Sequence, residues 1–301
     1  MSKDKIINLA FKNGLKIRPD TIQINQSGLD FLVAYALDED NISWVLRVPR
    51  RDDVIETAAK ENKILKTIKP FLSVDVPDWK IFSSEFIAYP KLIDEPIAIM
   101  DTKARAFIWR IDNNSLSDTF ISSMGKALAS LHSIDHQILK SEGFEVISTN
   151  HFRTEFGNNM NQAKTILDIP ENLWSNWQNW LNTDSNWQHN MQFIHGDLHP
   201  GHILADNNEK VTGILDWTEA KVSDPAIDFT VFYAIFGEQV LDRLLTAYKN
   251  SGGNVWPDIK NHINSTLLTY PVGFATYAIK SGDNSYLDVA QAMINSSSES
   301  L

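Results

Sequence analysis

Two aspartates with a short spacing between them could carry out chemistry. The segment HGDLHPGHIL, residues 195–204, places Asp197 in a loop with glycine and proline, between two short apolar runs. Asp216 ends the next apolar run, VTGILDW, nineteen positions later. A hairpin with its turn at 206–209 would bring the ends of these runs together. One carboxylate could then accept the proton of an attacking hydroxyl while the other holds Mg²⁺ against phosphates. The spacing therefore predicts a site for phosphoryl transfer.

Histidines around these aspartates leave a second interpretation open. His202 lies where an imidazole nitrogen or a water bridge could complete the shell of a metal ion. Together, His195, Asp197, His199, His202 and Asp216 could also bind zinc or a metal pair in a metallohydrolase. A tightly bound transition metal in the purified protein would distinguish this alternative. An isolated HGD triplet is most often a turn, so the hairpin and the second carboxylate carry the functional interpretation.

The elements that position these residues change in character along the chain. Three β-branched and aromatic runs between residues 20 and 49 predict consecutive antiparallel strands. A helix is expected from about 52 to 69, and two further strands fit 79–82 and 85–89. Helical periodicity then predominates, at 117–135, 151–166, 170–182, 224–235, 238–250, 257–281 and 283–298. Strands are expected among these helices only at 191–195, 202–206 and 211–216.

This order of elements predicts an α+β fold in two lobes. The N-terminal lobe, residues 1–92, would be an antiparallel β-rich lobe with a helix. The C-terminal lobe, residues 93–301, would be larger and mostly helical. A chain of 301 residues with 43% hydrophobic residues is long enough for two such units.

Composition narrows the classes of partner. The chain has no cysteine, so it has no disulfides and no thiolate metal site. A formal net charge of -11 argues against a broad nucleic-acid surface, which would use Lys and Arg to displace counterions from phosphates. No segment approaches the length of apolar sequence that a membrane helix needs, and no signal peptide is evident. We expect a cytoplasmic protein that binds small molecules.

The 195–217 segment resembles a known superfamily. HGDLHPGHIL followed by ILDW is similar to the catalytic and metal loops of the aminoglycoside phosphotransferase and choline kinase superfamily, distant relatives of protein kinases. The resemblance implies a bilobal protein-kinase-like fold, with Asp197 as catalytic base and Asp216 as the chief Mg²⁺ ligand. It also implies that the lobe at 1–92 binds the nucleotide and that the lobe at 93–301 carries the catalytic and acceptor-binding residues. His202 stands where most relatives carry a metal-binding asparagine, and is predicted here as a second metal ligand.

Segments along nearly the whole chain resemble one branch of this superfamily, the macrolide 2′-phosphotransferases. They are SGLDF at 27–31, WVLRVPRR at 44–51, VPDW at 76–79, AYPKL at 88–92, DWTEAKVSDPAIDF at 216–229 and LLTYPVGFATYA at 267–278. The resemblance implies transfer of the γ-phosphate of GTP, preferred over ATP, to the 2′-hydroxyl of the amino sugar of a macrolide antibiotic. Such transfer would inactivate the drug.

Two other functions stay open at this point. A kinase of the same fold could act on an aminoglycoside, choline, homoserine or another small alcohol, which acceptor profiling would reveal. A nucleotide-binding regulator without catalysis would fit the absence of lysine at position 47 and of asparagine at position 202. In such a regulator, Asp197→Asn would leave the biological effect intact.

The resemblance also assigns nucleotide-binding residues. Ser27 and Gly28 would lie in a hairpin turn over the phosphates, where backbone N–H groups and a hydroxyl can bind them. Arg47 takes the position of the kinase lysine that binds phosphate, and Glu61 is the helix acid that would pair with it. A linker strand would contact the purine edge with its backbone; its residues are Ala88, Tyr89, Pro90, Lys91, Leu92 and Ile93.

A macrolide is large, mostly apolar and cationic, so its pocket should contain aromatic side chains. Tyr270, Phe274 and Tyr277 are expected to line this pocket, because they lie in the matching family segment. Two further residues are assigned supporting roles. His195 would orient the catalytic loop through a side-chain hydrogen bond, and Asp228 would brace that loop or cap a helix.

Overall fold

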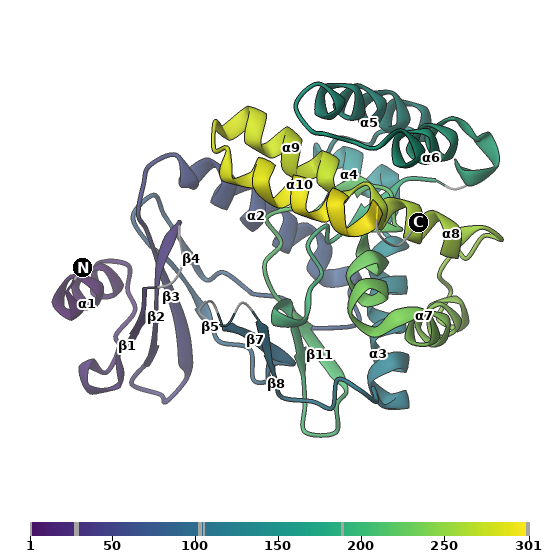
Figure 1. The fold of residues 1–301 in the computed structure, drawn as a ribbon. Coiled ribbons are helices and arrows are strands. Elements are labelled where there is room, and N and C mark those ends of the chain that lie inside the picture. Colours follow the sequence, from purple (N-terminus) through teal and green to yellow (C-terminus); the bar gives the residue numbers. More distant parts are fainter. Residues whose placement is uncertain (1, 27–29, 102–103, 105, 188–189, 299–301) are drawn as a thin grey trace. The chain divides into compact units, whose positions relative to one another are not determined.

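The computed structural model describes residues 2–26, 30–101, 104, 106–187 and 190–298. The chain divides into two compact units. The first comprises Met1–Asp112 and Pro200–Ala220, and the second comprises Asn113–His199 and Lys221–Leu301. Strands predominate in the first unit and helices in the second (Figure 1). The predicted α+β fold is therefore confirmed.

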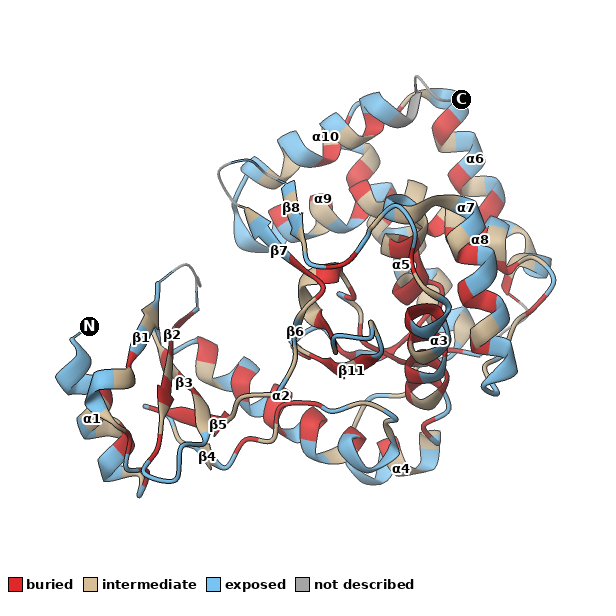
Figure 2. Ribbon diagram, turned by 90° about the horizontal axis from the view of Figure 1, so that it is seen from below, coloured by how far each residue is buried: buried red, intermediate tan, exposed pale blue. Residues whose placement is uncertain are grey.

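The first unit is built on a five-stranded antiparallel sheet with strand order β1-β2-β3-β5-β4. From Leu32 onward, side chains along β2 alternate between buried and half-buried positions, because successive residues on a strand point to opposite faces (Figure 2). The buried face contributes Leu32, Ala34 and Leu46 to the core of this unit. The strands are β1 (Gln23–Asn25), β2 (Phe31–Leu37), β3 (Ser43–Pro49), β4 (Ile81–Phe82) and β5 (Ile87–Pro90).

Two helices accompany this sheet. Helix α2, Val54–Ile68, is the one predicted from the apolar stripe, and it buries Ala58, Glu61 and Leu65 at helical spacing. Helix α1, Lys3–Lys12, was not predicted from the sequence. It is capped by Ser2, whose hydroxyl accepts a hydrogen bond from the backbone N–H of Lys5, and it buries Ile6 and Ala10 in the same core.

The hairpin predicted before Asp216 is present. Strand β10, Ile203–Ala205, pairs antiparallel with β11, Val211–Ile214. In the turn between them, the carboxylate of Asp206 accepts hydrogen bonds from the backbone N–H groups of Asn208 and Lys210. An aspartate that binds the backbone two and four residues ahead stabilises such a turn.

Residues 93–112 belong to the first compact unit rather than to the helical one. Strand β6, Glu95–Pro96, pairs with β10, and the guanidinium of Arg110 donates hydrogen bonds to the carbonyls of Glu95, Pro96 and Ala205. These bonds explain why the compact unit extends beyond residue 92, the lobe boundary predicted from the sequence. A further hairpin, β7 (Ala98–Asp101) with β8 (Ala106–Trp109), corrects the expectation that strands after residue 96 occur only near the catalytic segment.

Helices form most of the second unit. They are α3 (Asp118–His132), α4 (His136–Ser141), α5 (Thr149–Lys164), α6 (Glu171–Asn182), α7 (Ile227–Asn250), α8 (Ile259–Leu268), α9 (Tyr270–Ser281) and α10 (Ser285–Ser298). A short sheet pairs β9, Gln192–Ile194, with β12, Lys221–Ser223. Helix α4 and strand β12 were not predicted. Among the described residues, no helix is both long and apolar enough to cross a membrane.

Two helix boundaries show how the backbone overrides periodicity. The single helix predicted over 257–281 is wrong, because the chain breaks at Thr269 and restarts with Pro271 in the first turn of α9. Proline has no N–H and fits the start of a helix. Gly237, at φ 76°, interrupts α7 between the two helices predicted there. Glycine adopts this left-handed backbone conformation without strain.

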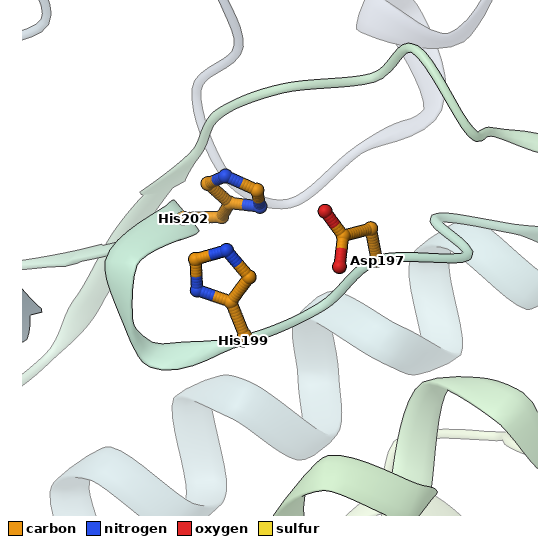
Figure 3. A group of neighbouring side chains, drawn as sticks. All are labelled: Asp197, His199 and His202. Carbon is orange, nitrogen blue, oxygen red and sulfur yellow. The ribbon is translucent and has the colours of Figure 1, made fainter. Parts of the chain in front are cut away.

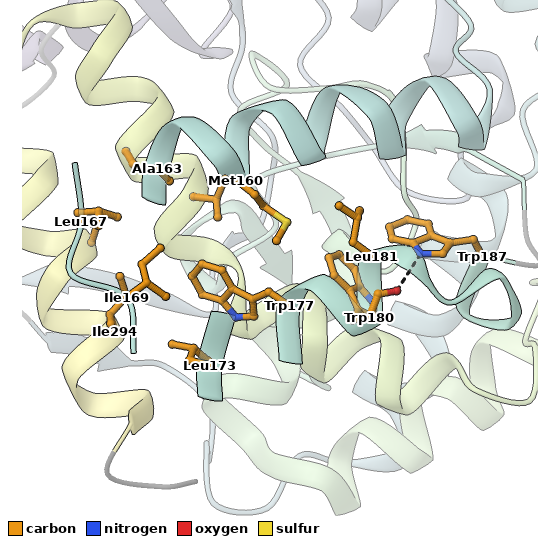
Figure 4. Packing of buried hydrophobic residues seen from close by; sticks show 13 residues of the cluster. Met160, Ala163, Leu167, Ile169, Leu173, Trp177, Trp180, Leu181, Trp187 and Ile294 are labelled. Atoms are coloured by element: carbon orange, nitrogen blue, oxygen red, sulfur yellow. Dashed lines mark hydrogen bonds between the residues drawn. The ribbon is translucent and has the colours of Figure 1, made fainter. Parts of the chain in front are cut away.

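Tryptophans dominate a core cluster in the second unit, drawn in Figure 4. Trp177 and Trp180 come from α6, and Trp187 follows it. The indole N–H of Trp187 donates to the carbonyl of Trp180 at 3.2 Å. A buried indole that finds such an acceptor keeps its large apolar area in the core without a desolvated donor.

Gly125 allows α3 and α7 to pack backbone against backbone. A Cβ at this position would lie 2.6 Å from the backbone nitrogen of Tyr248 and 2.7 Å from the Cβ of Ala247. We expect Gly125→Ala to lower the free energy of unfolding by about 1–3 kcal/mol, as overpacking does. Urea denaturation measures this change. Gly273→Ala on α9 is the control, because a Cβ there meets no atom within 4 Å; equal destabilisation of both variants would contradict the close approach.

Candidate active site

The loop that carries Asp197 begins where strand β9 ends. We call residues His195–Asp197 the catalytic loop. Its two first backbone N–H groups donate to one carboxylate: His195 to Oδ2 of Asp228 at 2.9 Å, and Gly196 to Oδ1 at 2.8 Å. Gly196 has φ 83°, a backbone conformation that suits glycine and turns both N–H groups toward the same acceptor. The carboxylate of Asp228 thus binds two consecutive N–H groups of the catalytic loop.

Asp228 is a buried carboxylate at the start of α7, with 1% of its surface exposed. Nε2 of His132, on α3, lies 3.1 Å from Oδ2 of Asp228. Burial opposes its ionisation, but the contact with His132 and the N–H groups of the catalytic loop hold its pKa below the ordinary value. Three hydrogen bonds thus converge on the carboxylate of Asp228, and its predicted role in bracing the loop stays a prediction.

His195 contacts the backbone of the catalytic loop. Its imidazole is fully buried, and Nδ1 accepts a hydrogen bond from the backbone N–H of Asp197 at 3.2 Å. The side chain of Asp197 itself is exposed. An exposed carboxylate on a braced loop can approach a bound hydroxyl, which is the geometry that a general base requires.

Asp197 is followed within five positions by two imidazoles. One ligand atom each from Asp197, His199 and His202 lies within 4.8 Å of the others (Figure 3). The short helical turn Pro200–His202 brings the last of these side chains back toward the loop. The local sequence DLHPGH therefore gathers one carboxylate and two nitrogen ligands, the group on which the metallohydrolase alternative depends.

A cavity of about 760 Å³ lies within the first unit. Two apolar walls enclose it, one from the sheet with Val33 and Val45, the other with Leu204 and Leu215. Strands β2 and β3 supply the first wall, and strand β10 with the residue after β11 supplies the second. Such a slot suits a flat aromatic ring, while the charged side chains elsewhere in the lining suit phosphates.

The predicted pair of Arg47 and Glu61 lines this cavity. The Arg47 guanidinium lies 3.0 Å from Oε2 of Glu61, whose side chain is 2% exposed. The guanidinium also lies over the rings of Phe31 and Trp79, at 4.2 and 5.2 Å from their centroids. A planar guanidinium can stack in this way and a lysine ammonium cannot. The arginine is therefore held by an acid and two rings at once, and these aromatic partners were missed from the sequence.

Asp216 also lines the cavity, beside His202. Oδ2 of Asp216 lies 3.7 Å from Nε2 of His202, and the hydroxyl of Thr218 donates to Oδ1 at 2.7 Å. Burial opposes ionisation, but His202 and Thr218 together lower the pKa of Asp216. Asp216 has φ 58°, which is uncommon for a residue other than glycine. Such local strain is typical of functional positions.

The linker residues are only partly at the cavity. Tyr89, Lys91 and Leu92 line it, whereas Ala88 is fully buried in the sheet and Ile93 is 95% exposed. Lys91 donates its backbone N–H to the carbonyl of Ser43, and Pro90 has no N–H to offer. Neither residue therefore offers a backbone N–H to a purine, and the predicted recognition of the purine would have to use other backbone groups of the linker. Ser27 and Gly28 lie outside the described residues.

The predicted acceptor residues lie along one face of α9, at spacings of four and three. Tyr270 bonds through its hydroxyl to Thr230, and burial and the nearby carboxylates of Asp228 and Asp197 raise its pKa. Phe274 packs against the core cluster, and Tyr277 is 51% exposed. The face thus begins near Asp197 and becomes more exposed along the helix. Their role in binding the acceptor stays a prediction.

Asp197 and Asp216 belong to different compact units, so the predicted approach of one carboxylate to the other stays a prediction. Sequence reasoning missed His132 and Tyr248, which lie behind the catalytic loop. His132 is a lone histidine on an amphipathic helix, and the residues next to it in the sequence do not indicate a role at the site. The aromatic contacts of Arg47 likewise arise from residues distant in sequence.

The chain matches a known family over most of its length. The phosphotransferase enzyme family (APH) matches residues 21–261. The uncharacterized protein YcbJ of Bacillus subtilis (strain 168) is 40% identical over 286 residues, which cover 95% of this chain and 94% of YcbJ. Nothing in that relative's name assigns a substrate, so solved structures are more informative.

Two macrolide 2′-phosphotransferase structures are similar over nearly the whole chain. MphH from Brachybacterium faecium, in its apo form, is 34% identical with a TM-score of 0.90 and 97% of each chain covered. A macrolide 2′-phosphotransferase of type I is also 34% identical, with a TM-score of 0.86, covering 97% of this chain and 96% of that one. The chain therefore belongs to the phosphotransferase enzyme family and shares the protein-kinase-like fold of the macrolide 2′-phosphotransferases.

Proposed function

We propose that this phosphotransferase transfers the γ-phosphate of GTP, in preference to ATP, to the 2′-hydroxyl of the amino sugar of macrolide antibiotics and so inactivates them. The similarity to two macrolide 2′-phosphotransferases, at 34% identity over 97% of the chain, carries the proposal. The braced Asp197 and the charged cavity of the first unit support the same reaction. The family match favours phosphoryl transfer over the metallohydrolase alternative.

The cavity of the first unit is the proposed nucleotide site. Its apolar walls would hold the purine, and Arg47 would bind phosphate oxygens through the edge of the guanidinium that Glu61 leaves available. Arg47 is already fixed between two rings and an acid, so little side-chain freedom remains to be lost when the phosphate binds. Preference for GTP rests on the resemblance to the macrolide branch.

Asp216 and His202 fit a Mg²⁺ ion bound with the nucleotide. Asp216 keeps its charge because its pKa is lowered, and a carboxylate oxygen is the ligand that Mg²⁺ prefers. His202 would complete the shell directly or through water. When bound, the ion would neutralise charge on the phosphates and orient them. A donor set of one carboxylate, one imidazole and phosphate oxygens suits this role.

The charge of the cavity makes nucleotide binding dependent on Mg²⁺. Among its described lining residues, five carboxylates face only two cationic side chains, Arg47 and Lys91. The acids are Asp30, Glu61, Asp94, Glu95 and Asp216. A triphosphate without a metal ion would meet this excess of negative charge. We expect chelation of Mg²⁺ to weaken GTP binding at least about tenfold, which corresponds to a loss of roughly 1.4 kcal/mol of binding free energy.

Isothermal titration of GTP with and without EDTA measures this difference. Asp216→Asn should lower the affinity for GTP only when Mg²⁺ is present, because the variant loses the ligand and not the phosphate contacts. Asp20→Asn, an exposed aspartate that does not line the cavity, is the control. Equal GTP affinity in Mg²⁺ and in EDTA would contradict the proposed metal site.

Asp197 would act on the acceptor. Its carboxylate takes the proton from the 2′-hydroxyl as that oxygen forms its bond to the γ-phosphorus. The bond between the γ-phosphorus and the bridging oxygen breaks, and the nucleoside diphosphate leaves with the electron pair. The catalytic loop contributes by holding the carboxylate in place, through Asp228 and His195.

The aromatic face of α9 is the proposed place for the apolar macrolide ring. It begins with Tyr270, whose pKa is raised by burial and by the carboxylates of Asp228 and Asp197, and continues to Phe274 and Tyr277. Tyr286, from α10, extends the face, with its ring 4.5 Å from that of Tyr277. Exposed aromatic rings of this kind provide the contact area that a large apolar ligand needs.

An acceptor panel tests the proposal. Transfer from GTP or ATP, with Mg²⁺, is followed by product mass for erythromycin, azithromycin, kanamycin, choline and homoserine. We expect phosphorylated macrolides with a kcat/KM well above that of the other acceptors. Phosphorylation of kanamycin, choline or homoserine alone would keep the reaction class and reject the macrolide assignment. Absence of transfer to every acceptor would favour the nucleotide-binding regulator.

A further inference from the structure

A chain of buried hydrogen bonds connects the far end of α7 to the catalytic loop. The Tyr248 hydroxyl lies 3.0 Å from Nδ1 of His132, and Nε2 of His132 lies 3.1 Å from Oδ2 of Asp228. Asp228 in turn accepts the N–H groups of the catalytic loop. Tyr248, His132 and Asp228 are 1%, 4% and 1% exposed. Solvent therefore offers no ready substitute for any bond in the chain.

The direction of each bond follows from the groups that meet. Asp228 is ionised, because its pKa is lowered, so it can only accept. A neutral imidazole has a single N–H, and this must lie on Nε2 of His132 to reach Asp228. Nδ1 is then an acceptor and needs a donor. The Tyr248 hydroxyl supplies one, since burial raises the pKa of Tyr248 and keeps its proton in place.

The Tyr248 hydroxyl has other contacts among the described residues: it hydrogen-bonds to the backbone of Asn254, and the side chain of Gln192 offers an acceptor for its proton. Oε1 of Gln192, on β9, lies 3.4 Å away, compared with 3.0 Å for Nδ1 of His132. The shorter contact favours the imidazole as the acceptor. Gln192 also leads directly into the catalytic loop. The Tyr248 hydroxyl therefore contacts both His132, which binds the anchor Asp228, and the strand that precedes the catalytic loop.

We propose that Tyr248 is a positioning residue for phosphoryl transfer. Its hydroxyl donates to Nδ1 of His132 and holds the ring at the hydrogen bond to Asp228, and thereby holds the backbone of the catalytic loop. The inference rests on the role proposed above for Asp197. It adds a residue 51 positions away along the sequence, on the second half of a helix whose first half holds the anchor.

Two glycines place the hydroxyl where this role requires it. Gly237 interrupts α7 between Asp228 and Tyr248, so both residues of one helix can contact the same imidazole. Gly125 lets the backbone of α7 at Tyr248 approach α3, the helix that carries His132. The position of Tyr248 is thus set by backbone features and not by the flexibility of its side chain.

The second unit contains a matched pair of residues for comparison. Nε2 of His262 lies 2.5 Å from Oδ2 of Asp224, and Nδ1 accepts from the indole N–H of Trp180 at 3.1 Å. His262 is 1% exposed. It is therefore another buried imidazole between an aromatic donor and a carboxylate. Its carboxylate is Asp224 and not the anchor Asp228, so His262→Gln serves as the control for general destabilisation.

The test compares Tyr248→Phe with His262→Gln in the full-length enzyme. Removing the hydroxyl deletes its hydrogen bond to His132, together with its contacts to Gln192 and Asn254, and leaves the ring, so we expect kcat to fall about 3- to 10-fold. The KM for GTP should stay within about twofold, because the nucleotide cavity is lined by other residues. His262→Gln should lower the melting temperature and leave kcat nearly unchanged. A wild-type kcat in Tyr248→Phe, or parallel losses in both variants, would overturn the proposal.

A double variant tests whether Tyr248 acts through His132. His132→Leu removes the imidazole, so adding Tyr248→Phe to it should reduce kcat no further. His132→Gln keeps an amide donor for Asp228 and an oxygen acceptor for Tyr248, and should retain more activity than His132→Leu. Independent effects of the two changes would contradict the coupling.

A readout without an acceptor covers the case in which no macrolide is phosphorylated. Amide hydrogen exchange of Gly196 reports directly on its bond to Asp228. We expect faster exchange at Gly196 in Tyr248→Phe than in wild type or His262→Gln. Inactivity of the wild type toward macrolides would then reject the proposed function alone, while unchanged exchange at Gly196 would reject the positioning role.

Discussion

Asp197→Asn should lose nearly all phosphoryl transfer while it continues to bind nucleotide. An amide cannot accept the proton of the attacking hydroxyl, and general base catalysis contributes about 10²- to 10⁴-fold. The nucleotide cavity is lined by residues of the first unit, and Asp197 is not one of them. We therefore expect kcat to fall by that factor and the affinity for GTP to stay within about twofold. Single-turnover transfer and calorimetry measure the two quantities.

The control for this variant is Asp118→Asn, an aspartate of the same unit whose side chain is fully exposed. It should transfer phosphate like the wild type. Loss of GTP binding in Asp197→Asn would place the residue in the nucleotide site instead. Full turnover by Asp197→Asn would remove the base from the mechanism altogether.

Asp228→Asn should have the largest effect on stability. The carboxylate accepts bonds from His132, His195 and Gly196 in a buried position. An amide offers only one acceptor oxygen and turns its own N–H groups toward these donors. We expect the free energy of unfolding to fall by about 3–5 kcal/mol, the usual effect of breaking a buried charged pair. Urea denaturation measures it.

The same variant should change how stability depends on pH. The folded pKa of Asp228 is below that of an unfolded aspartate, about 3.9. Its stabilising effect is therefore complete above that pH and is lost as the pH falls through the folded pKa. The difference between wild type and Asp228→Asn should shrink below about pH 4. Asp184→Asn, at an exposed ion pair, should leave the curve nearly unchanged. A constant difference down to low pH would contradict an ionised anchor.

Local sequence signals predicted those parts of the fold in which neighbours along the chain interact. In the turn after β10, Asp206 accepts hydrogen bonds from the backbone N–H groups of Asn208 and Lys210, so the hairpin could be predicted from the local sequence. The pairing of Arg47 with Glu61 was implied by the resemblance to the kinase pattern, and the ion pair is present. Pro271, at the start of α9, was also a readable signal for a helix boundary, although periodicity hid it.

Long-range packing decides what the sequence does not show. Tyr248 and His132 are 116 positions apart, and their contact depends on the close approach of α3 and α7 at Gly125. Stacking of Arg47 on Trp79 similarly requires a sheet and a loop to be in place. No local pattern of polarity marks such residues, because each reads as an ordinary core side chain until its partner is known. The supports of the site are therefore visible only in the folded protein.

The proposed reaction places a phosphate on the 2′-oxygen of a macrolide. Erythromycin is incubated with GTP, Mg²⁺ and the wild-type protein, and the product is analysed by mass and by phosphorus–proton coupling in NMR spectra. We expect one added phosphate with coupling to the 2′ proton, and no such product with Asp197→Asn. Unmodified erythromycin, or a phosphate on another hydroxyl, would contradict it.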